Sequence, residues 1–320
     1  MPLPEDIAAL VAAGHGVVDV PTAEAAGVSP DRLERLVRRG ELVRLRRGAF
    51  GDVTRLEPWA AYRREVRAAL LVCRDPAWAT RWAGAAVHRL PHVGPPPAAI
   101  HLVRDKTPGA YPSQHGRTRT LVAALPESAR TEVDGLAVCT PERVAVDLAR
   151  TADFRDALVV ADAVLHRGLA TPTTLAAEAA VQADWPGGRR AARVVRHADG
   201  GAENPLETLG RLACLEYDLP VPLSNVWVGE TFPEFRVDHL WPDHWLIGEG
   251  DGLGKYEDVT VVQAEKERQW RLEQLGFAVV RYGWQLAYAR RPALAARFVD
   301  RLRRPGIPRV PARWWPTDAR

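Results

Sequence analysis

Lysine, cysteine and methionine are scarce in this chain of 320 residues, which has 43 basic residues but only three lysines, three cysteines and one methionine. The cysteines Cys73, Cys139 and Cys214 form no CxxC or Cys/His spacing, which argues against a zinc site or a disulfide framework and predicts a reducing compartment. No stretch approaches the roughly 18–20 apolar residues that cross a bilayer. The acidic amino terminus is also unlike a signal peptide. We therefore expect a cytoplasmic protein without a membrane segment, and the lack of a P-loop or GxGxxG argues against an organic cofactor.

Positive charge is concentrated near the amino terminus, although the formal net charge of the whole chain is only +3. Between Arg32 and Arg67, 11 arginines stand against five acidic residues. A net charge of +3 is too small to identify a partner by itself. The local cluster therefore carries more information than the total.

The order of elements in residues 1–70 predicts a winged helix-turn-helix domain. A helix with Ser29 as its cap and Pro30 at its first position carries Leu33 and Leu36 on one face and arginines on the others. The following LVRLRRGAFG, residues 42–51, predicts a basic hairpin with a glycine turn. The alternative is a small helical domain with solvated arginines. The residues expected to contact DNA are Arg32, Arg35, Arg38, Arg39, Arg44, Arg46 and Arg47.

The segment VPTAEAAGVSPDRLERLVRRGELVRLRRGAFG resembles the winged-helix domain of AbiEi-like antitoxins, over about residues 5–55. These antitoxins are the regulatory half of type IV toxin–antitoxin systems. The resemblance implies binding to operator DNA and a cognate toxin or defence-system partner. A weaker similarity continues through residues 82–93 and 135–168, and predicts an α/β middle domain at 71–197.

A third domain is expected at residues 198–320, in the order α-β-β-β-α-β-α. Its strands are predicted at 223–228, 234–242, 244–252 and 277–284, and its longest helix at 258–276. The whole chain is thus expected to be of the mixed α+β class.

This order, with the pieces ENPLE, RVDHLWP and GEGDGLGKY, resembles the restriction-endonuclease core, PD-(D/E)XK. More narrowly, it is similar to very-short-patch-repair-like endonuclease domains. The resemblance implies a metal-dependent DNA endonuclease with catalytic residues at Glu207, Asp238, Glu249, Asp251 and Lys255, and with metal ligands at Asp238, Glu249 and Asp251.

The spacing of the acids independently predicts a metal site. If Trp241–His244 form the turn, Asp238 faces Ile247, and Glu249 lies on the same sheet face as a diagonal neighbour of Asp238. Two adjacent carboxylates repel each other unless a cation lies between them, and Mg²⁺ or Mn²⁺ suits such ligands.

The lysine departs from the usual D/E-x-K spacing. Asp251 stands where that lysine is expected, and Lys255 follows four residues later, so Asp251 is either a second ligand or a group that orients water. Lys266 is a competing candidate for the catalytic cation. Glu207 either belongs to the metal site or forms a capping box with Asn204, and the two roles are compatible.

Two functions remain open from the sequence, and so does the oligomeric state. One is a metal-dependent endonuclease delivered to DNA by the winged helix. The other is a non-enzymatic antitoxin or repressor whose carboxyl-terminal domain is inactive or binds protein. Acids that simply face solvent on a hairpin would fit the second function.

Overall fold

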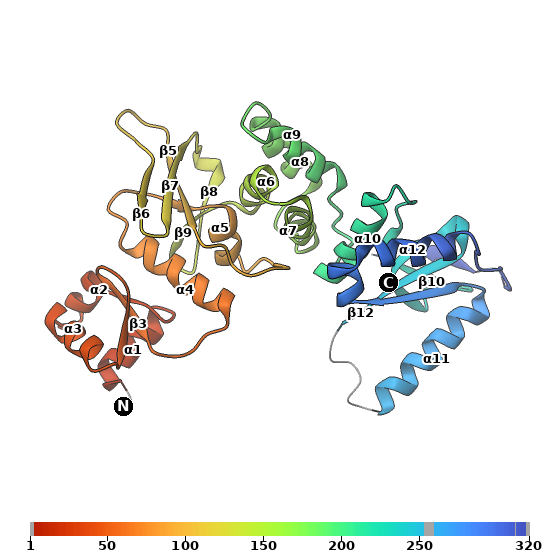
Figure 1. Cartoon of the computed structure of the whole chain (residues 1–320), viewed down its shortest axis with the longest axis horizontal. Helices are drawn as coiled ribbons and strands as arrows, with labels where there is room; N and C mark the ends of the chain where they lie inside the picture. The colour runs from red at the N-terminus through yellow and green to blue at the C-terminus, as the bar shows by residue number, and fades with distance from the viewer. Residues whose placement is uncertain (1–2, 253–258, 311, 318–320) are drawn as a thin grey trace. The chain divides into compact units, whose positions relative to one another are not determined.

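The computed structural model describes residues 3–252, 259–310 and 312–317, and the chain forms two compact units (Figure 1). Unit 1 comprises residues 1–90 and 94–151, and unit 2 comprises residues 91–93 and 152–320. Among the described residues, no helix combines the length and apolar character needed to span a membrane.

The first part of unit 1 contains a helix-turn-helix followed by a basic hairpin. Its sheet has the strand order β1-β3-β2, and Leu33, Leu36 and Phe50 are buried in one cluster with residues of α1. Gly48, at the tip of the hairpin, has a φ of 85°, which favours glycine. The elements are α1 (Glu5–Ala13), β1 (Val18–Asp19), α2 (Val20–Ala25), α3 (Pro30–Arg38), β2 (Leu42–Arg46) and β3 (Ala49–Asp52).

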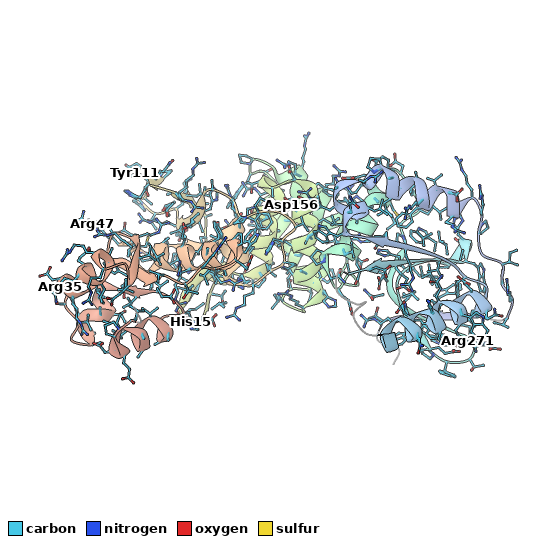
Figure 2. All side chains as sticks on the ribbon, turned by 60° about the horizontal axis from the view of Figure 1, so that its bottom comes forward. His15, Arg35, Arg47, Tyr111, Asp156 and Arg271 are labelled. Carbon is cyan, nitrogen blue, oxygen red and sulfur yellow. The ribbon has the colours of Figure 1, made fainter. Side chains whose placement is uncertain are left out.

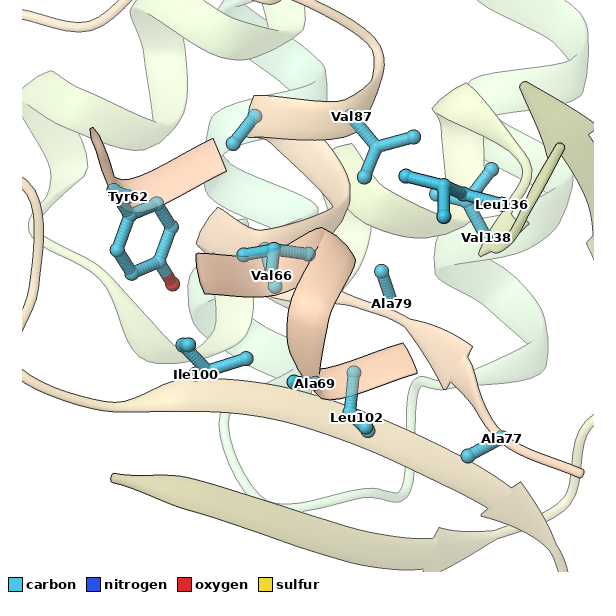
Figure 3. Close-up of a cluster of buried hydrophobic side chains, with 12 residues drawn as sticks. Tyr62, Val66, Ala69, Ala77, Ala79, Val87, Ile100, Leu102, Leu136 and Val138 are labelled. Atoms are coloured by element: carbon cyan, nitrogen blue, oxygen red, sulfur yellow. The ribbon is translucent and has the colours of Figure 1, made fainter. Parts of the chain in front are cut away.

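The rest of unit 1 is a six-stranded sheet with helices packed against it. The strand order is β6-β7-β5-β4-β9-β8. Figure 3 shows the core, in which Tyr62 and Val66 pack against Ile100, Leu102 and Val138. The elements are α4 (Pro58–Leu71), β4 (Trp78–Ala79), α5 (Arg81–Val87), β5 (Ile100–Asp105), β6 (Ser113–His115), β7 (Thr118–Ala123), η1 (Glu127–Ala129), β8 (Arg130–Val133), β9 (Leu136–Cys139) and α6 (Pro141–Thr151).

Unit 2 begins with three helices and continues into a five-stranded sheet covered on both faces. The strand order is β13-β12-β11-β10-β14, with only β12 and β13 parallel. The edge strand β14 was not predicted from the sequence. The elements are α7 (Phe154–His166), α8 (Pro172–Val181), α9 (Gly188–His197), α10 (Pro205–Glu216), β10 (Leu223–Gly229), β11 (Phe235–Trp241), η2 (Pro242–His244), β12 (Leu246–Asp251), α11 (Val259–Leu275), β13 (Ala278–Gly283), η3 (Gln285–Ala289), α12 (Arg291–Leu302) and β14 (Arg313–Trp315).

The two faces of the unit 2 sheet bury different helices. Leu272 and Leu275 of α11 join a cluster with Val237, Leu240 and Ile247 of the sheet. On the other face, α10 and α12 contact the sheet through aromatic groups such as Trp241. Figure 1 shows α11 on one side of the sheet and α10 and α12 on the other.

A buried ionic network explains why α7, α8 and α9 group with the carboxyl-terminal part of the chain. Asp162 of α7, only 1% exposed, accepts hydrogen bonds from Arg211 at 2.7 Å and Thr208 at 2.9 Å, both on α10. The backbone N–H of Asp199 also donates to Asp162, at 2.8 Å. The compact units therefore divide near Thr151, whereas the sequence suggested boundaries after residues 70 and 197. Periodicity could not reveal this, because the bonds join residues almost 50 positions apart.

Gly210 allows α10 to approach the sheet closely. A Cβ atom at this position would lie 2.1 Å from Tyr282 Oη and 2.8 Å from His239 Nε2. We expect Gly210→Ala to lower the free energy of unfolding by about 1–3 kcal/mol, as overpacked cores do. Urea unfolding measures this effect. Gly283→Ala is the matched control, because its Cβ would meet nothing closer than 3.7 Å, and equal losses in the two variants would contradict the explanation.

Candidate functional site

The seven arginines predicted to contact DNA fall into two groups in the structure. Three of them are tied to carboxylates: Arg32 bonds Asp6 at 2.6 Å, Arg39 bonds Glu41 at 3.0 Å, and Arg44 bonds Glu34. Arg46 is half-buried, and this burial lowers the pKa of its guanidinium. All four arginines were expected to contact DNA. In the structure three of them form ion pairs within the domain and the fourth is half-buried.

The remaining three arginines are exposed on α3 and at the tip of the hairpin. Within the part of unit 1 that the structure describes, Arg35, Arg38 and Arg47 form no ion pair. Figure 2 shows Arg35 and Arg47 projecting outward from the winged helix. Their charges are therefore the ones available for phosphate groups.

An acidic cavity of about 380 Å³ lies in unit 2, where strands β10 to β12 meet the amino-terminal part of α10 and the helix α11. It contains four of the five residues predicted to be catalytic. The fifth, Lys255, lies outside the described residues. The cavity is lined by Glu203, Asn204, Glu207, Asn225, Arg236, Asp238, Glu249, Gly250, Asp251, Glu265 and Arg268.

Asp238 and Glu249 come together in this cavity, but by a different strand register from the expected one. His239 pairs with Gly248, and Leu240 pairs with Ile247. Continuing this register by one residue puts Asp238 directly opposite Glu249, not diagonal to it. The predicted turn was wrong by one residue, because Trp241 still pairs with Leu246 in the ladder.

The strands are distorted where Asp238 enters the cavity. Asn225, opposite Asp238, has a φ of 49° and is absent from the ladder between Ser224–His239 and Val226–Val237. As a result, Val237 and Leu240 join the same core cluster although they are an odd number of residues apart. Such irregularities in a strand redirect side chains and are common next to active sites.

The pKa of Glu249 reports the electrostatics of the cavity. Burial, followed by the charge of Asp238, raises the pKa of this carboxyl to about 7, against the opposing effect of Arg268. Glu249 is only 5% exposed. The two carboxylates are thus close enough to repel each other in a poorly solvated space, which favours a cation.

In the described part of unit 2, the cations at these acids are arginines rather than the predicted lysines. Arg268 of α11 donates to Glu249 Oε1 at 3.0 Å and to the carbonyl oxygen of Arg236 at 2.5 Å. Lys266, the alternative candidate, is exposed and does not line the cavity. Arg268 lies four and seven residues before the buried Leu272 and Leu275, and this helical spacing is the signal that could have identified it.

Asp251 and Glu207 are also held by hydrogen bonds. Arg281 of β13 donates to Asp251 at 2.9 Å. The carboxylate of Glu207 accepts from the backbone N–H of Glu203 at 2.8 Å and from the side-chain amide of Asn225 at 2.6 Å. Asn204 in turn caps α10 by accepting from the N–H of Glu207 at 3.2 Å. Half of the expected capping box is thus present, because Asn204 caps the helix while the carboxylate of Glu207 accepts from the N–H of Glu203 rather than that of Asn204. The place of Glu207 in the cavity wall leaves a metal-binding role open.

The donor set fits a hard divalent cation only in part. Mg²⁺ takes one or two carboxylates as ligands and completes its shell with water and substrate oxygens. Asp238 and Glu249 can supply the two carboxylates. Among the described residues, however, no three His, Cys, Asp or Glu side chains are close enough to hold a metal ion together. Arg268 would also have to give up its bond to Glu249.

Comparisons with known proteins give relatives that match only part of the chain. Two uncharacterized proteins of Mycobacterium tuberculosis, MT2308 of strain CDC 1551 / Oshkosh and Rv2248 of strain ATCC 25618 / H37Rv, are 29% identical over 149 residues. The match covers 46% of this chain, and the chain spans about half the length, 55%, of these curated relatives.

The crystal structure of the RV2827C protein from Mycobacterium tuberculosis is 15% identical, with a TM-score of 0.39, and the match covers 69% of this chain and 84% of that one. Residues 5–51 match the sequence model of the AbiEi antitoxin transcriptional regulators. The family model alone supports an AbiEi antitoxin-type transcriptional regulator domain at residues 5–51, the part of the chain that contains α3 and the basic hairpin.

Proposed function

We propose that this protein binds DNA through its winged helix and hydrolyses DNA phosphodiesters with Mg²⁺ or Mn²⁺ at the acidic cavity of unit 2. The main support for DNA hydrolysis is that Asp238 and Glu249 line the same cavity, where the repulsion between their carboxylates favours a cation. The regulator domain at residues 5–51 supports the first half, and its family suggests a toxin–antitoxin context with a toxin as a second partner.

In this proposal Asp238 and Glu249 hold the cation, and Asp251 binds it or orients water. The chemistry that a divalent cation would supply between these carboxylates is a lowered pKa of a bound water and compensation of the charge on the phosphate. Arg268 has the role expected of the catalytic lysine. Its guanidinium can replace its hydrogen bond to Glu249 by one to a phosphate oxygen that gains negative charge during the reaction. Glu207 and Asn225 fix the wall behind Asp238 through their hydrogen bond.

The test of catalysis is cleavage of supercoiled plasmid by the purified protein with Mg²⁺ or Mn²⁺, beside the Glu249→Gln variant. Nicked or linear DNA from the parent, and none from the variant, would support the proposal. Equal products from both proteins would exclude the cavity as their source.

DNA binding by the winged helix has its own test. Replacing Arg35, Arg38 and Arg47 by glutamine removes three exposed charges, so we expect the slope of log K against log salt to become shallower by about 2–3. Fluorescence anisotropy of a labelled duplex, measured in EDTA, gives this slope. The exposed Arg74 and Arg119, changed to glutamine, control for lost charge, and an equal change in both variants would contradict the assignment.

A second candidate function is a regulator without catalysis, in which unit 2 binds protein or is an inactive relative of a nuclease. The ion pairs of Arg268 with Glu249 and of Arg281 with Asp251 favour it, because they neutralise the acids without a metal. This function predicts salt-sensitive operator binding and no cleavage with any metal. A neighbouring gene for a nucleotidyltransferase-like toxin would also support it.

A further inference from the structure

Aromatic rings and guanidinium groups contact one another in two neighbouring sets, one at the end of β13 and η3 and one between α7 and α9. Gly283, the last residue of β13, is in register with Asp251 of the cavity wall. Trp284 follows directly and stacks on Tyr288 of η3, with ring centroids 5.7 Å apart and an interplanar angle of 12°. Because neighbouring strands are about 4.8 Å apart, the backbone of Trp284 lies within roughly 10 Å of the backbone of Asp251.

The first set reaches from η3 to the amino-terminal end of α7. The guanidinium of Arg155 lies 4.7 Å from the ring centre of Tyr288, and its neighbour Phe154 carries the guanidinium of Arg193 at 4.2 Å. His197, at the end of α9, meets the edge of Phe154 at 6.1 Å. We call the surface formed by Trp284, Tyr288, Arg155, Phe154 and Arg193, with the other exposed arginines of α9, the aromatic–arginine strip.

Helix α9 supplies most of the available charge. Residues 187–197 contain four arginines and no acidic residue. Arg189, Arg193 and Arg196 are exposed and form no ion pair with any described residue, while Arg190 donates to the carbonyl oxygen of Ala152 at 2.5 Å. Arg155, by contrast, is neutralised by Asp156 at 2.6 Å. The cation–π contact with Phe154 fixes the position of Arg193 without consuming its charge.

The cavity itself cannot attract DNA. Its lining has six carboxylates, from Glu203, Glu207, Asp238, Glu249, Asp251 and Glu265, against only the two guanidiniums of Arg236 and Arg268. Phosphate groups are repelled by such a wall unless cations beside it compensate. The strip is a cationic surface of the same unit.

The length of α9 suits a nucleic acid. The ten residues of α9 extend about 15 Å. B-DNA carries one phosphate charge per about 1.7 Å of its axis, so a helix of this length can contact several phosphates. Arginines on a helix with aromatic neighbours are also the chemistry by which proteins hold sugar–phosphate backbones.

We infer that the aromatic–arginine strip is a second DNA-binding surface, which holds the phosphates of the DNA flanking the cavity. The inference rests on the proposed function only in taking the cavity as the place where that DNA is processed. Binding at the strip needs no metal and no cleavage.

The experiment uses the full chain with Arg35, Arg38 and Arg47 changed to glutamine, so that the winged helix does not mask weaker binding. One variant adds the changes of Arg189, Arg193 and Arg196 to glutamine to this background. The control adds the changes of Arg297 and Arg301 of α12 and of Arg303, which follows the helix, to glutamine. The control removes the same charge from exposed positions of the same unit. Anisotropy of labelled 30-base-pair DNA is measured in EDTA over a series of salt concentrations.

We expect the α9 variant to lose at least about tenfold in affinity near 0.1 M salt, with a salt slope shallower by about 2–3, and the control to lose less than about twofold. Equal losses in the two variants, or no measurable binding by the background protein, would overturn the inference. Tighter binding to an RNA duplex of the same sequence would overturn the assignment to DNA. Because EDTA prevents cleavage, failure of the nuclease proposal leaves this test unaffected.

Discussion

Glu249→Gln is expected to reduce metal-dependent DNA cleavage by at least about 100-fold, the scale on which removing one group that stabilises transition-state charge acts. The variant keeps the size and the hydrogen-bonding oxygen of the side chain but removes the negative charge that, with Asp238, would hold the cation. The measurement is the rate of nicking of supercoiled plasmid at several Mg²⁺ and Mn²⁺ concentrations. Asp238→Asn should give a similar loss.

Unfolding must be separated from lost catalysis in this experiment, and the pKa of Glu249 provides the means. Because burial and Asp238 raise it to about 7, the stability that protonation of Glu249 provides is fully present below about 4.5 and is lost as the pH rises through 7. Glu249→Gln should therefore be at least as stable as the parent at pH 8. An inactive variant that is also less stable at pH 8 would not support a catalytic role.

The matched control is Glu230→Gln, which removes a carboxylate of the same unit outside the cavity, 3.9 Å from Arg271. This variant should cut at the parental rate. If the parent does not cleave DNA with any metal, the regulator function of the second proposal replaces the nuclease.

Arg211→Leu is expected to cost unit 2 about 3–5 kcal/mol of stability at pH 8, the range for removing one partner of a buried ion pair. Arg211 is 3% exposed, and it bonds Asp162 at 2.7 Å and the carbonyl oxygen of His197 at 2.6 Å. The variant leaves the carboxyl of Asp162 buried with only Thr208 and a backbone N–H as donors. The link between α7 and α10 should therefore weaken.

The loss should also depend on pH. Burial raises the pKa of Asp162 to about 6, against the opposing charge of Arg211. The carboxyl of Asp162 therefore holds its proton to a higher pH in the folded state than in the unfolded state. Stability from that protonation is present below about 3.8 and is lost as the pH rises through 6. Without Arg211 the folded pKa moves higher, so the difference between variant and parent should grow from pH 6 to pH 8.

Urea unfolding followed by tryptophan fluorescence measures this effect, since eight of the 11 tryptophans lie at or after Trp185, in unit 2. Arg211→Lys is the control, because it keeps a positive charge near Asp162 and should lose less. A loss that is the same at pH 6 and pH 8 would show that the ion pair is not its cause.

The succession of helices and strands followed from local patterns in the sequence. The Pro30 start of α3, the alternation of β2 and the Asn204 cap of α10 are local signals, and each element lies close to its predicted range. Alternation also indicated that Asp238 and Glu249 belong together. It did not give the register, because a turn shifted by one residue moves the pairing by two.

Several residues of the cavity were not identified from the sequence, for physical reasons. Asn225 acts through a left-handed backbone conformation, which no residue pattern in β10 announces. Arg268 was not predicted because the catalytic cation was expected to be a lysine. The spacing of Arg268 to Leu272 nevertheless indicated that it lies on the inner face of α11. The strand β14 is short and pairs with β10 from more than 80 residues away.

By itself, the sequence determined the local elements, the arginine-rich winged helix and the likeness of residues 5–51 to AbiEi regulators, because caps, periodicity and motifs are properties of neighbouring residues. Only the tertiary structure decided which charges are available and which are neutralised. Arg35 and Arg47 are exposed while Arg32 and Arg44 are paired, and Glu249 forms an ion pair with Arg268. Ion pairs and burial depend on contacts between distant segments, and these exist only once the chain has folded.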